Sequence, residues 1–181
     1  VTPLIRTPTL GCFLKLESLQ RTGCVQLRGA ALKLTRMMAL DRTAGVVAAS
    51  AGNQGLALSC VGRSVGIPVR VVVPESAPRC KREAITSFGG ELVRHGASLV
   101  EAEKMGRRLA ALRDALFVSP CEDPDVIEGD GEWLGMEILR QSSAVTRIVV
   151  PMGGGGLAAG LAAAVCEAGV EVIGVQPAIH S

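Results

Sequence analysis

The sequence predicts an α/β fold built around a parallel sheet, on two observations. Short apolar runs such as 45–49 and 69–73 alternate with longer segments in which apolar residues recur at helical spacing. The turns that lead from strand to helix, at 50–55 and 152–157, are rich in glycine and small residues. This alternation favours parallel strands joined by right-handed crossovers.

The sequence predicts a strand, a loop and a helix in the first part of the chain. After an extended opening segment at 2–4, the stretch 12–17 alternates as a short strand does. The loop 20–26 follows. From 27 to 40 the apolar residues recur every three or four positions, which predicts a helix leading out of that loop.

The remainder repeats this pattern. Apolar runs predict buried strands, and periodic segments predict the helices between them. Pro74 closes one strand, and the glycine pair 89–90 ends one helix. The expected strands are 45–49, 69–73, 91–94, 116–118, 148–150 and 170–175, and the expected helices are 56–65, 79–88, 98–112, a region around 131–141, and 157–167.

Composition and charge exclude several classes of function. Lys and Arg number 19 against 17 for Asp and Glu, so we expect no basic surface for nucleic acid. The uncharged run 148–166 is long enough to suggest a membrane helix. Pro151 and the four glycines at 153–156 instead favour a strand, a turn and a helix, so no membrane association is expected.

The six cysteines show no metal-binding or disulfide pattern. They lack CxxC spacing, and the histidines are limited to His95 and His180. The sequence begins at Val1 without a signal-peptide pattern. We therefore expect buried or half-buried thiols in a reducing cytoplasm and no metal site. The cysteines are Cys12, Cys24, Cys60, Cys80, Cys121 and Cys166.

The glycine turn before the last helix admits three interpretations. Gly153, Gly154, Gly155 and Gly156, followed by Leu157, could cradle a phosphate with backbone N–H groups at a helix N-terminus. The pattern also fits a loose dinucleotide fingerprint, but the acidic residue expected about 20 positions later is Gln176. A purely structural turn does not require the entropic cost of four glycines.

A second strand-to-helix turn lies at Ser50-Ala51-Gly52-Asn53-Gln54-Gly55. Ser and Asn are ordinary helix-capping residues, so this turn could simply start a helix. The same side chains could also hydrogen-bond a ligand.

Taken together in order, these segments resemble the fold-type II pyridoxal phosphate (PLP) enzymes, and within them the threonine and serine dehydratases and serine racemase. The resemblance covers nearly the whole chain. It is carried by Thr2-Pro3-Leu4, Lys15-Leu16-Glu17, 20–30, 50–54, Pro74 with Pro78 and Lys81, Asp123-Pro124-Asp125, 129–131 and 153–157.

The resemblance implies roles for particular residues. The turn from Gly153 to Leu157 matches the loop that binds the PLP phosphate, and Asn53 matches the residue that hydrogen-bonds the pyridine 3-oxygen. Ser50, Ala51, Gly52 and Gln54 match the loop that grips the substrate carboxylate, where the family usually has His in place of Gln54.

The departure of greatest consequence is Gln26, which stands where the family has its Schiff-base lysine. That lysine bonds to the PLP aldehyde and later takes the α-proton of the substrate as general base. A primary amide does neither, so covalent attachment of PLP is not expected. Lys33 lies seven residues on, about 10 Å along a helix, and is not expected to substitute.

Other departures concern neighbouring positions. Glu132 stands where the family's Gly-Gln-Gly-Thr run has Thr, with Asp130 before it, which brings two carboxylates into a region expected to be tightly packed. Gln176 replaces a glutamate that ligates a divalent cation in racemase-type members, so no metal is expected.

The resemblance also implies the domain organisation. We expect a large PLP-binding domain at 1–44 and 121–181, interrupted by a small α/β domain at 45–120. The family continues well beyond the position of Ser181, so the large domain is expected to be truncated at the C-terminus, with an exposed sheet edge.

The function implied is PLP-dependent removal of ammonia from L-threonine or L-serine, giving a 2-oxo acid. Two alternatives stand beside it. One is a catalytically inactive relative or fragment that binds PLP or an amino acid, or serves as an interaction subunit. The other is a serine racemase-type activity. A homodimer is expected if the full domain is present.

Overall fold

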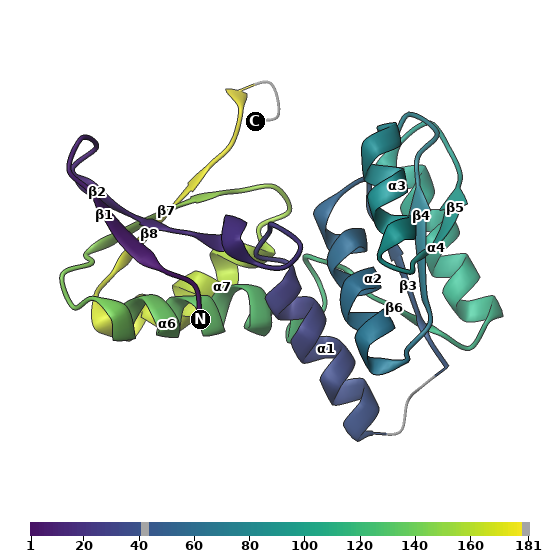
Figure 1. Ribbon diagram of the computed structural model, residues 1–181, viewed down its shortest axis with the longest axis horizontal. Helices are drawn as coiled ribbons and strands as arrows, with labels where there is room; N and C mark the ends of the chain where they lie inside the picture. Colours follow the sequence, from purple (N-terminus) through teal and green to yellow (C-terminus); the bar gives the residue numbers. More distant parts are fainter. Residues whose placement is uncertain (41–43, 179–181) are drawn as a thin grey trace. The chain divides into compact units, whose positions relative to one another are not determined.

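The computed structural model describes residues 1–40 and 44–178, which form two compact units (Figure 1). The first unit consists of Val1–Gly29 and Pro120–Ser181, and the second of Ala30–Ser119. Helix α1 (Leu27–Ala39) passes from one unit into the other and is counted mostly with the second. The domain limits at 44/45 and 120/121 stay a prediction, and each unit is described by itself below.

The second unit is built around a parallel four-stranded sheet in the order β5-β4-β3-β6. Helices pack on both faces of this sheet. On one face Val69 and Val71 point at glycines of α2, and on the other Val72 packs with Ala102 of α4. The strands are β3 (Val46–Ala49), β4 (Val69–Val73), β5 (Glu91–Arg94) and β6 (Leu116–Phe117), and the helices are α2 (Asn53–Val65), α3 (Arg79–Ser87) and α4 (Leu99–Leu112).

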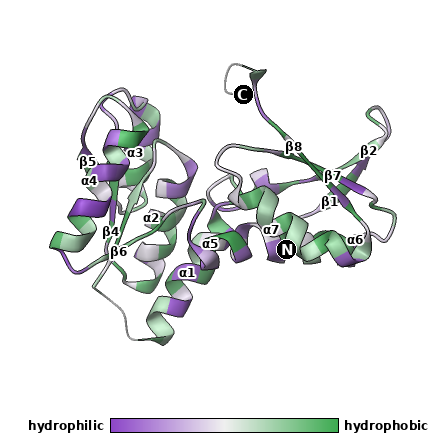
Figure 2. Cartoon of the chain, turned by 180° about the vertical axis from the view of Figure 1, so that it is seen from behind, coloured by the Kyte–Doolittle hydropathy of each residue, from purple (hydrophilic) through white to green (hydrophobic). Residues whose placement is uncertain are grey.

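The core of the second unit follows from its sequence pattern. All four residues of β3 are buried, as expected for a central strand covered on both faces. Strand β4 is apolar along most of its length, whereas α3 and α4 alternate hydrophilic and hydrophobic positions (Figure 2). This is the pattern of a buried sheet flanked by amphipathic helices.

The first unit combines an antiparallel hairpin, a short parallel sheet and a group of helices. Strands β1 (Leu4–Thr7) and β2 (Cys12–Lys15) form the hairpin, and β7 (Arg147–Pro151) pairs in parallel with β8 (Glu171–Val175). The helical segments are η1 (Glu17–Leu19), α5 (Pro124–Ile127), the π-helical η2 (Glu128–Glu132), α6 (Trp133–Gln141), α7 (Gly156–Val165) and η3 (Cys166–Ala168).

Close backbone contacts join the helices of the first unit. An added Cβ on Gly131 would lie 2.5 Å from the Cα of Gly160, in the middle of α7. An added Cβ on Gly129 would lie 2.6 Å from the Cα of Gly29. Only residues without a side chain allow η2 to lie this close to both neighbours. A small apolar core, formed by Leu134, Ile138, Val150 and Leu161, completes the unit.

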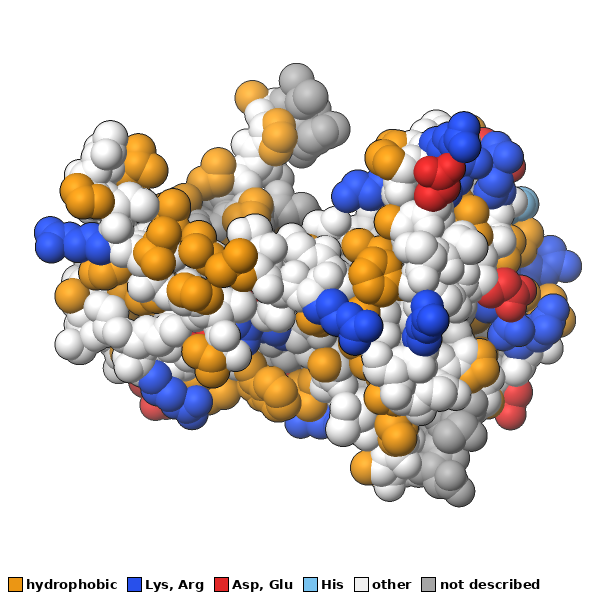
Figure 3. Space-filling view, in the orientation of Figure 1, with side chains coloured by type: hydrophobic (Ala, Val, Ile, Leu, Met, Phe, Trp, Pro, Cys, Tyr) orange, Lys and Arg blue, Asp and Glu red, His pale blue; other side chains and the backbone are white. Residues whose placement is uncertain are grey.

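Exposed apolar side chains gather on the first unit (Figure 3). They come mainly from the hairpin and from β7: Ile5, Leu10, Phe13, Leu14 and Val149. Within the described residues the β7–β8 sheet has two strands, so each strand has an unpaired edge.

The strands and helices expected from the sequence are found with small shifts at their ends. Three details differ. A strand at 4–7, which pairs with β2, follows the extended opening segment, and α5 and η2 precede α6 where no element was expected. Cys12, Cys80 and Cys166 are exposed, so the expectation that all six thiols are at least half-buried was wrong.

The uncharged run 148–166 forms β7, the glycine turn and α7, as expected. Across the described part of the chain, every helix is too short or too polar to span a bilayer.

Candidate functional site

Gln26 occupies the last turn position before α1. Backbone hydrogen bonds fix the turn, from Gly23 N to Gln20 O at 2.8 Å and from Arg28 N to Val25 O at 2.9 Å. The Gln26 side chain is half-buried, and its Oε1 has no hydrogen-bond partner among the described residues. An enclosed acceptor without a donor is unusual and costs free energy.

An ion-pair network centred on Arg28 anchors this turn to the rest of the first unit. The Arg28 side chain is only 10% exposed. It donates to both carboxylate oxygens of Glu17, from Nε at 2.9 Å and from Nη2 at 2.8 Å. It also donates to both oxygens of Glu137, from Nη1 at 2.9 Å and from Nη2 at 3.0 Å. Such bidentate pairs fix geometry as well as charge.

Further residues satisfy the remaining oxygens of the network. Thr2 donates from its backbone N to Glu137 Oε1 at 2.9 Å and from its hydroxyl to Glu17 Oε1 at 2.5 Å. Lys15 pairs with Glu137 and also donates to the carbonyl of Thr2 at 2.7 Å. The segments Thr2-Pro3-Leu4, Lys15-Leu16-Glu17 and 20–30, which carry the family resemblance, therefore meet in one network.

The network changes the ionisation of its members. Burial raises the pKa of Glu137, but hydrogen bonds from Arg28 and Lys15 outweigh it and hold this pKa well below its usual range. Burial also raises the pKa of Glu17. Hydrogen bonds from Arg28, Thr2 and Gln20 outweigh this effect, so the pKa of Glu17 is lowered. Burial tends to lower the pKa of Arg28, yet its bonds to the two carboxylates raise it. All three groups are therefore charged at neutral pH.

Asp130 contacts the start of α1 from η2. Its Oδ1 accepts a hydrogen bond from Gly29 N at 2.7 Å, and its side chain is buried. Burial raises the pKa of Asp130 to about 7, against opposing contributions from the Gly29 N–H and the charge of Arg28. Glu132, in the same segment, is half-buried. The predicted pair of carboxylates therefore has one deeply buried member.

The glycine turn lies between β7 and α7, as expected. Gly155 has φ +89 and precedes α7, whose N-terminus has no side-chain cap. An added Cβ on Gly154 would collide with Cys121 Sγ, and one on Gly156 would lie 2.5 Å from Pro120 O. A side chain at 154, 155 or 156 would therefore be strained, and the first N–H groups of α7 have no side-chain acceptor among the described residues.

This turn fits the phosphate of PLP, because it offers uncapped N–H groups on a backbone without side chains. Gln26 does not fit covalent attachment, because an amide nitrogen is not a nucleophile at neutral pH. The first unit thus has a turn suited to the phosphate, and position 26 has no amine for the aldehyde.

The loop 50–54 belongs to the second unit, between β3 and α2. Ser50 Oγ accepts a hydrogen bond from Gly52 N at 3.1 Å. Asn53 is the first residue of α2 and is exposed. Gln54 is only 5% exposed, and neither end of its amide has a hydrogen-bond partner among the described residues.

The site residues predicted from the sequence thus lie in both units, Gln26 and 153–157 in the first and 50–54 in the second. The sequence analysis missed Glu137 altogether. It named Thr2 but did not predict that Thr2 contacts Glu137 and Glu17. A signal for Glu137 exists in the sequence, because it lies between Leu134 and Ile138 on the apolar face of α6. Gln176 follows β8, and the described residues contain no group of three metal-ligating side chains.

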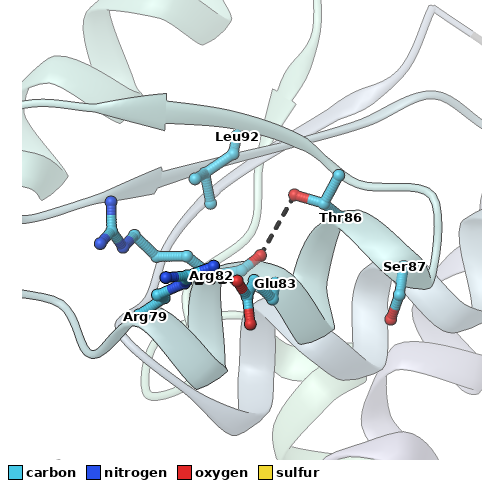
Figure 4. A pocket seen from close by; sticks show the side chains of 6 residues that line it. All are labelled: Arg79, Arg82, Glu83, Thr86, Ser87 and Leu92. Carbon is cyan, nitrogen blue, oxygen red and sulfur yellow. Dashed lines mark hydrogen bonds and ion pairs between the residues drawn. The ribbon is translucent and has the colours of Figure 1, made fainter.

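A wide depression of about 540 Å³ lies on α3 and β5 (Figure 4). None of the residues that line it belongs to the loop 50–54. Arg79 is paired with Glu83 at 2.6 Å, and the hydroxyls of Thr86 and Ser87 already donate to backbone carbonyls. Arg82 also lines the depression, and its Nε has no hydrogen-bond partner among the described residues. One such N–H group on an open surface does not identify a ligand, and we assign none.

Comparisons with known proteins show the family and part of the fold. The family model described as "Pyridoxal-phosphate dependent enzyme" matches residues 1–181. The chain is 40% identical over 168 residues to the catabolic L-threonine dehydratase TdcB of Escherichia coli (strain K12), covering 91% of this chain and 50% of that protein. It is 38% identical over 170 residues to serine racemase of Bos taurus, covering 91% of this chain and 51% of that protein.

Solved structures agree. The processed form of threonine deaminase isoform 2 from Solanum lycopersicum superposes with a TM-score of 0.89 at 30% identity, covering 98% of this chain and 54% of that one. Maize serine racemase superposes with a TM-score of 0.89 at 27% identity, and the match covers 98% of this chain and 56% of that one. The chain spans about half the length of these relatives, so the match shows part of the fold-type II architecture.

Proposed function

Because the chain belongs to the family of pyridoxal-phosphate dependent enzymes, we propose that it binds PLP without a covalent bond at position 26. In this proposal it is a non-catalytic relative of the threonine and serine dehydratases. The glycine turn 153–157 holds the phosphate, Asn53 donates to the pyridine 3-oxygen, and the loop of Ser50, Ala51, Gly52 and Gln54 receives an amino-acid carboxylate.

The observation that carries the proposal is Gln26. The relatives' chemistry needs an amine that bonds the cofactor and a base that takes a proton from the substrate α-carbon. The Gln26 amide supplies neither, although the Arg28 network around it is complete. Bound PLP supplies an electron sink for bonds at the α-carbon. This chain's residues position the cofactor and the substrate but do not move the proton.

A second candidate is the dehydratase reaction itself, the removal of ammonia from L-threonine or L-serine to give a 2-oxo acid. The 40% identity to a threonine dehydratase favours it. The 38% identity to serine racemase favours a racemase-type activity in the same way. We also propose a homodimer if the full domain is present.

The test compares the wild-type protein with Gln26→Lys. Both are titrated with PLP, treated with borohydride and digested, and modified lysines are located by mass spectrometry. We expect the wild type to bind PLP and to carry no specific reduced adduct, whereas Gln26→Lys carries one at position 26. Arg21→Lys is the matched control, because it adds a lysine to the same loop at an exposed position.

Release of 2-oxo acid from L-serine and L-threonine is assayed in parallel. An adduct on any lysine of the wild type, or 2-oxo acid release by the wild type, would overturn the proposal in favour of the second candidate. Absence of PLP binding by the wild type would overturn both.

A further inference from the structure

Helices α2 and α3 pack against each other in the second unit. An added Cβ on Gly55 of α2 would lie 2.6 Å from Val71 Cγ1 and 3.4 Å from Ile85 Cδ1 of α3. An added Cβ on Gly90, just after α3, would collide with Ser59 Oγ and lie 3.1 Å from Ser59 Cβ of α2. The missing side chains let Ile85 pack against the start of α2, and this sets the position of α3.

This packing brings Lys81 to Asn53. Lys81 lies four residues before Ile85, one turn earlier on α3, and Asn53 lies two residues before Gly55. The Lys81 Nζ donates a hydrogen bond to Asn53 Oδ1 at 3.3 Å. Both side chains are exposed, so a ligand can reach the pair.

The chemistry of the two groups fixes the orientation of the amide. A lysine ammonium has three donors and no acceptor. If the Asn53 amide were flipped, its NH₂ group would face the ammonium, and two donors would oppose each other. The Oδ1 must therefore point to Lys81, and the Nδ2 donor points away from it. A hydrogen bond from a cation also polarises the amide and strengthens its N–H donor.

We propose that Lys81 is a positioning residue, which holds the Asn53 amide so that Nδ2 donates to the 3-oxygen of PLP. This inference rests on the proposed function, in which Asn53 contacts that oxygen. It adds a residue on another helix that selects which end of the amide meets the cofactor.

Two of the other lysines are placed differently. Lys15 is engaged with Glu137 in the first unit. Lys104 is exposed on α4, which packs on the opposite face of the sheet. Lys104→Met is therefore the matched control for removal of one exposed lysine charge from the same unit.

The first experiment is a double-mutant cycle on PLP affinity, measured by equilibrium fluorescence titration of the full chain. We expect Lys81→Met to weaken binding about five- to tenfold, the loss of one hydrogen bond. Lys81→Arg should restore most of the affinity, and Lys104→Met should leave it unchanged. In an Asn53→Ala background, Lys81→Met should cause no further loss, because its effect passes through Asn53.

Additive losses in the cycle, or equal losses in Lys81→Met and Lys104→Met, would overturn the inference. Either result would mean that Lys81 acts by its charge or by folding alone.

The second experiment needs no cofactor. The side-chain amide signals of Asn53 are assigned by NMR in the cofactor-free protein and compared between wild type and Lys81→Met. We expect the Asn53 Cγ and Nδ2 signals to shift in Lys81→Met and to stay in place in Lys104→Met. An unchanged Asn53 signal contradicts the Lys81 contact. If instead the signals shift but wild type does not bind PLP, the proposed function fails while the Lys81–Asn53 contact stands.

Discussion

The backbone N–H of Gly29 donates a hydrogen bond to Asp130 Oδ1 at 2.7 Å, and both residues are buried. This contact joins the first turn of α1 to the π-helical segment η2. An added Cβ on Gly29 would lie 2.6 Å from Val126 O and 2.8 Å from Asp130 Oδ1. The carboxyl group therefore acts as the cap of α1 from another part of the chain, directly beside the turn that holds Gln26.

Asp130 makes the stability of the fold depend on pH in the neutral range. Burial raises its pKa from 3.8 to about 7, so the folded state binds the proton more tightly than the unfolded state does. The stabilisation from this group is complete below pH 4 and is lost as the pH rises through 7. We expect the loss to be about 4 kcal/mol at most, from the size of the shift.

The measurement is urea unfolding of wild type and Asp130→Asn from pH 4 to pH 8. The asparagine keeps an acceptor for Gly29 N and does not ionise. The variant should become more stable relative to wild type as the pH rises. The charged groups that act on Asp130 are Arg28 and Glu17, both of which stay charged above pH 5. A difference between the two proteins that is constant with pH would contradict the assignment.

Arg28 is expected to be the most sensitive charged residue of the first unit. Replacing it by Met leaves the half-buried Glu17 and the buried Glu137 without the cation that they share. We expect Arg28→Met to lower the free energy of unfolding by about 3–5 kcal/mol. Arg79→Met is the control, because the Arg79–Glu83 pair is exposed and should contribute about 0.5 kcal/mol or less. Chemical denaturation at pH 7 measures both.

Two alanine variants of the glycine turn differ in whether the added methyl group meets a neighbouring atom. Gly154→Ala places a methyl group against Cys121 Sγ, whereas a methyl group at Gly153 meets nothing within 4 Å. We expect Gly154→Ala to weaken PLP binding about tenfold or more, because the turn must shift away from its position at the α7 N-terminus. Gly153→Ala needs no shift of the turn and should weaken binding less than Gly154→Ala does.

Combining Gly154→Ala with Cys121→Ala removes the sulfur atom from the collision. Affinity should then recover in part. A Gly154→Ala affinity equal to that of wild type, measured by the same titration, would rule out this turn as the phosphate site.

Gln54 should show opposite effects on stability and on binding. Its buried amide has no partner among the described residues, so Gln54→Met removes an uncompensated polar group. We expect the free energy of unfolding to rise by about 1 kcal/mol. The affinity of the PLP-loaded protein for L-threonine, measured by calorimetry, should fall. An increase in stability without any change in threonine binding would place Gln54 outside the substrate loop.

Gln141→Met is the contrasting variant. Gln141 donates to the carbonyl of Thr2 at 2.8 Å and accepts from Lys15 at 2.7 Å. The loss of these bonds should lower the stability by about 1 kcal/mol.

The sequence was sufficient for most of the fold, because the strands and helices have clear apolar periodicity. Strand β4 was expected at 69–73 and is found there. The segment η2 was missed, since its π-helical form depends on the backbone contacts of Gly129 and Gly131 with distant glycines. Local patterns do not contain such contacts.

The same limit applies to the site. Gln26 and the glycine turn are visible as motifs, but the partners of Arg28 are 11 and 109 residues away in sequence. Their pairing becomes visible only when η1, α1 and α6 are assembled. The bond from Lys81 to Asn53 depends in the same way on how closely α2 and α3 pack.

The Arg28 network is built without any contribution from the Gln26 side chain. The turn is shaped by its neighbours, and position 26 has a half-buried side chain with an unused oxygen. This makes position 26 a natural site for saturation mutagenesis. Side chains carrying amines, thiols, imidazoles or carboxylates could be compared on one unchanged scaffold, so that differences in reactivity would report on the installed group and not on folding.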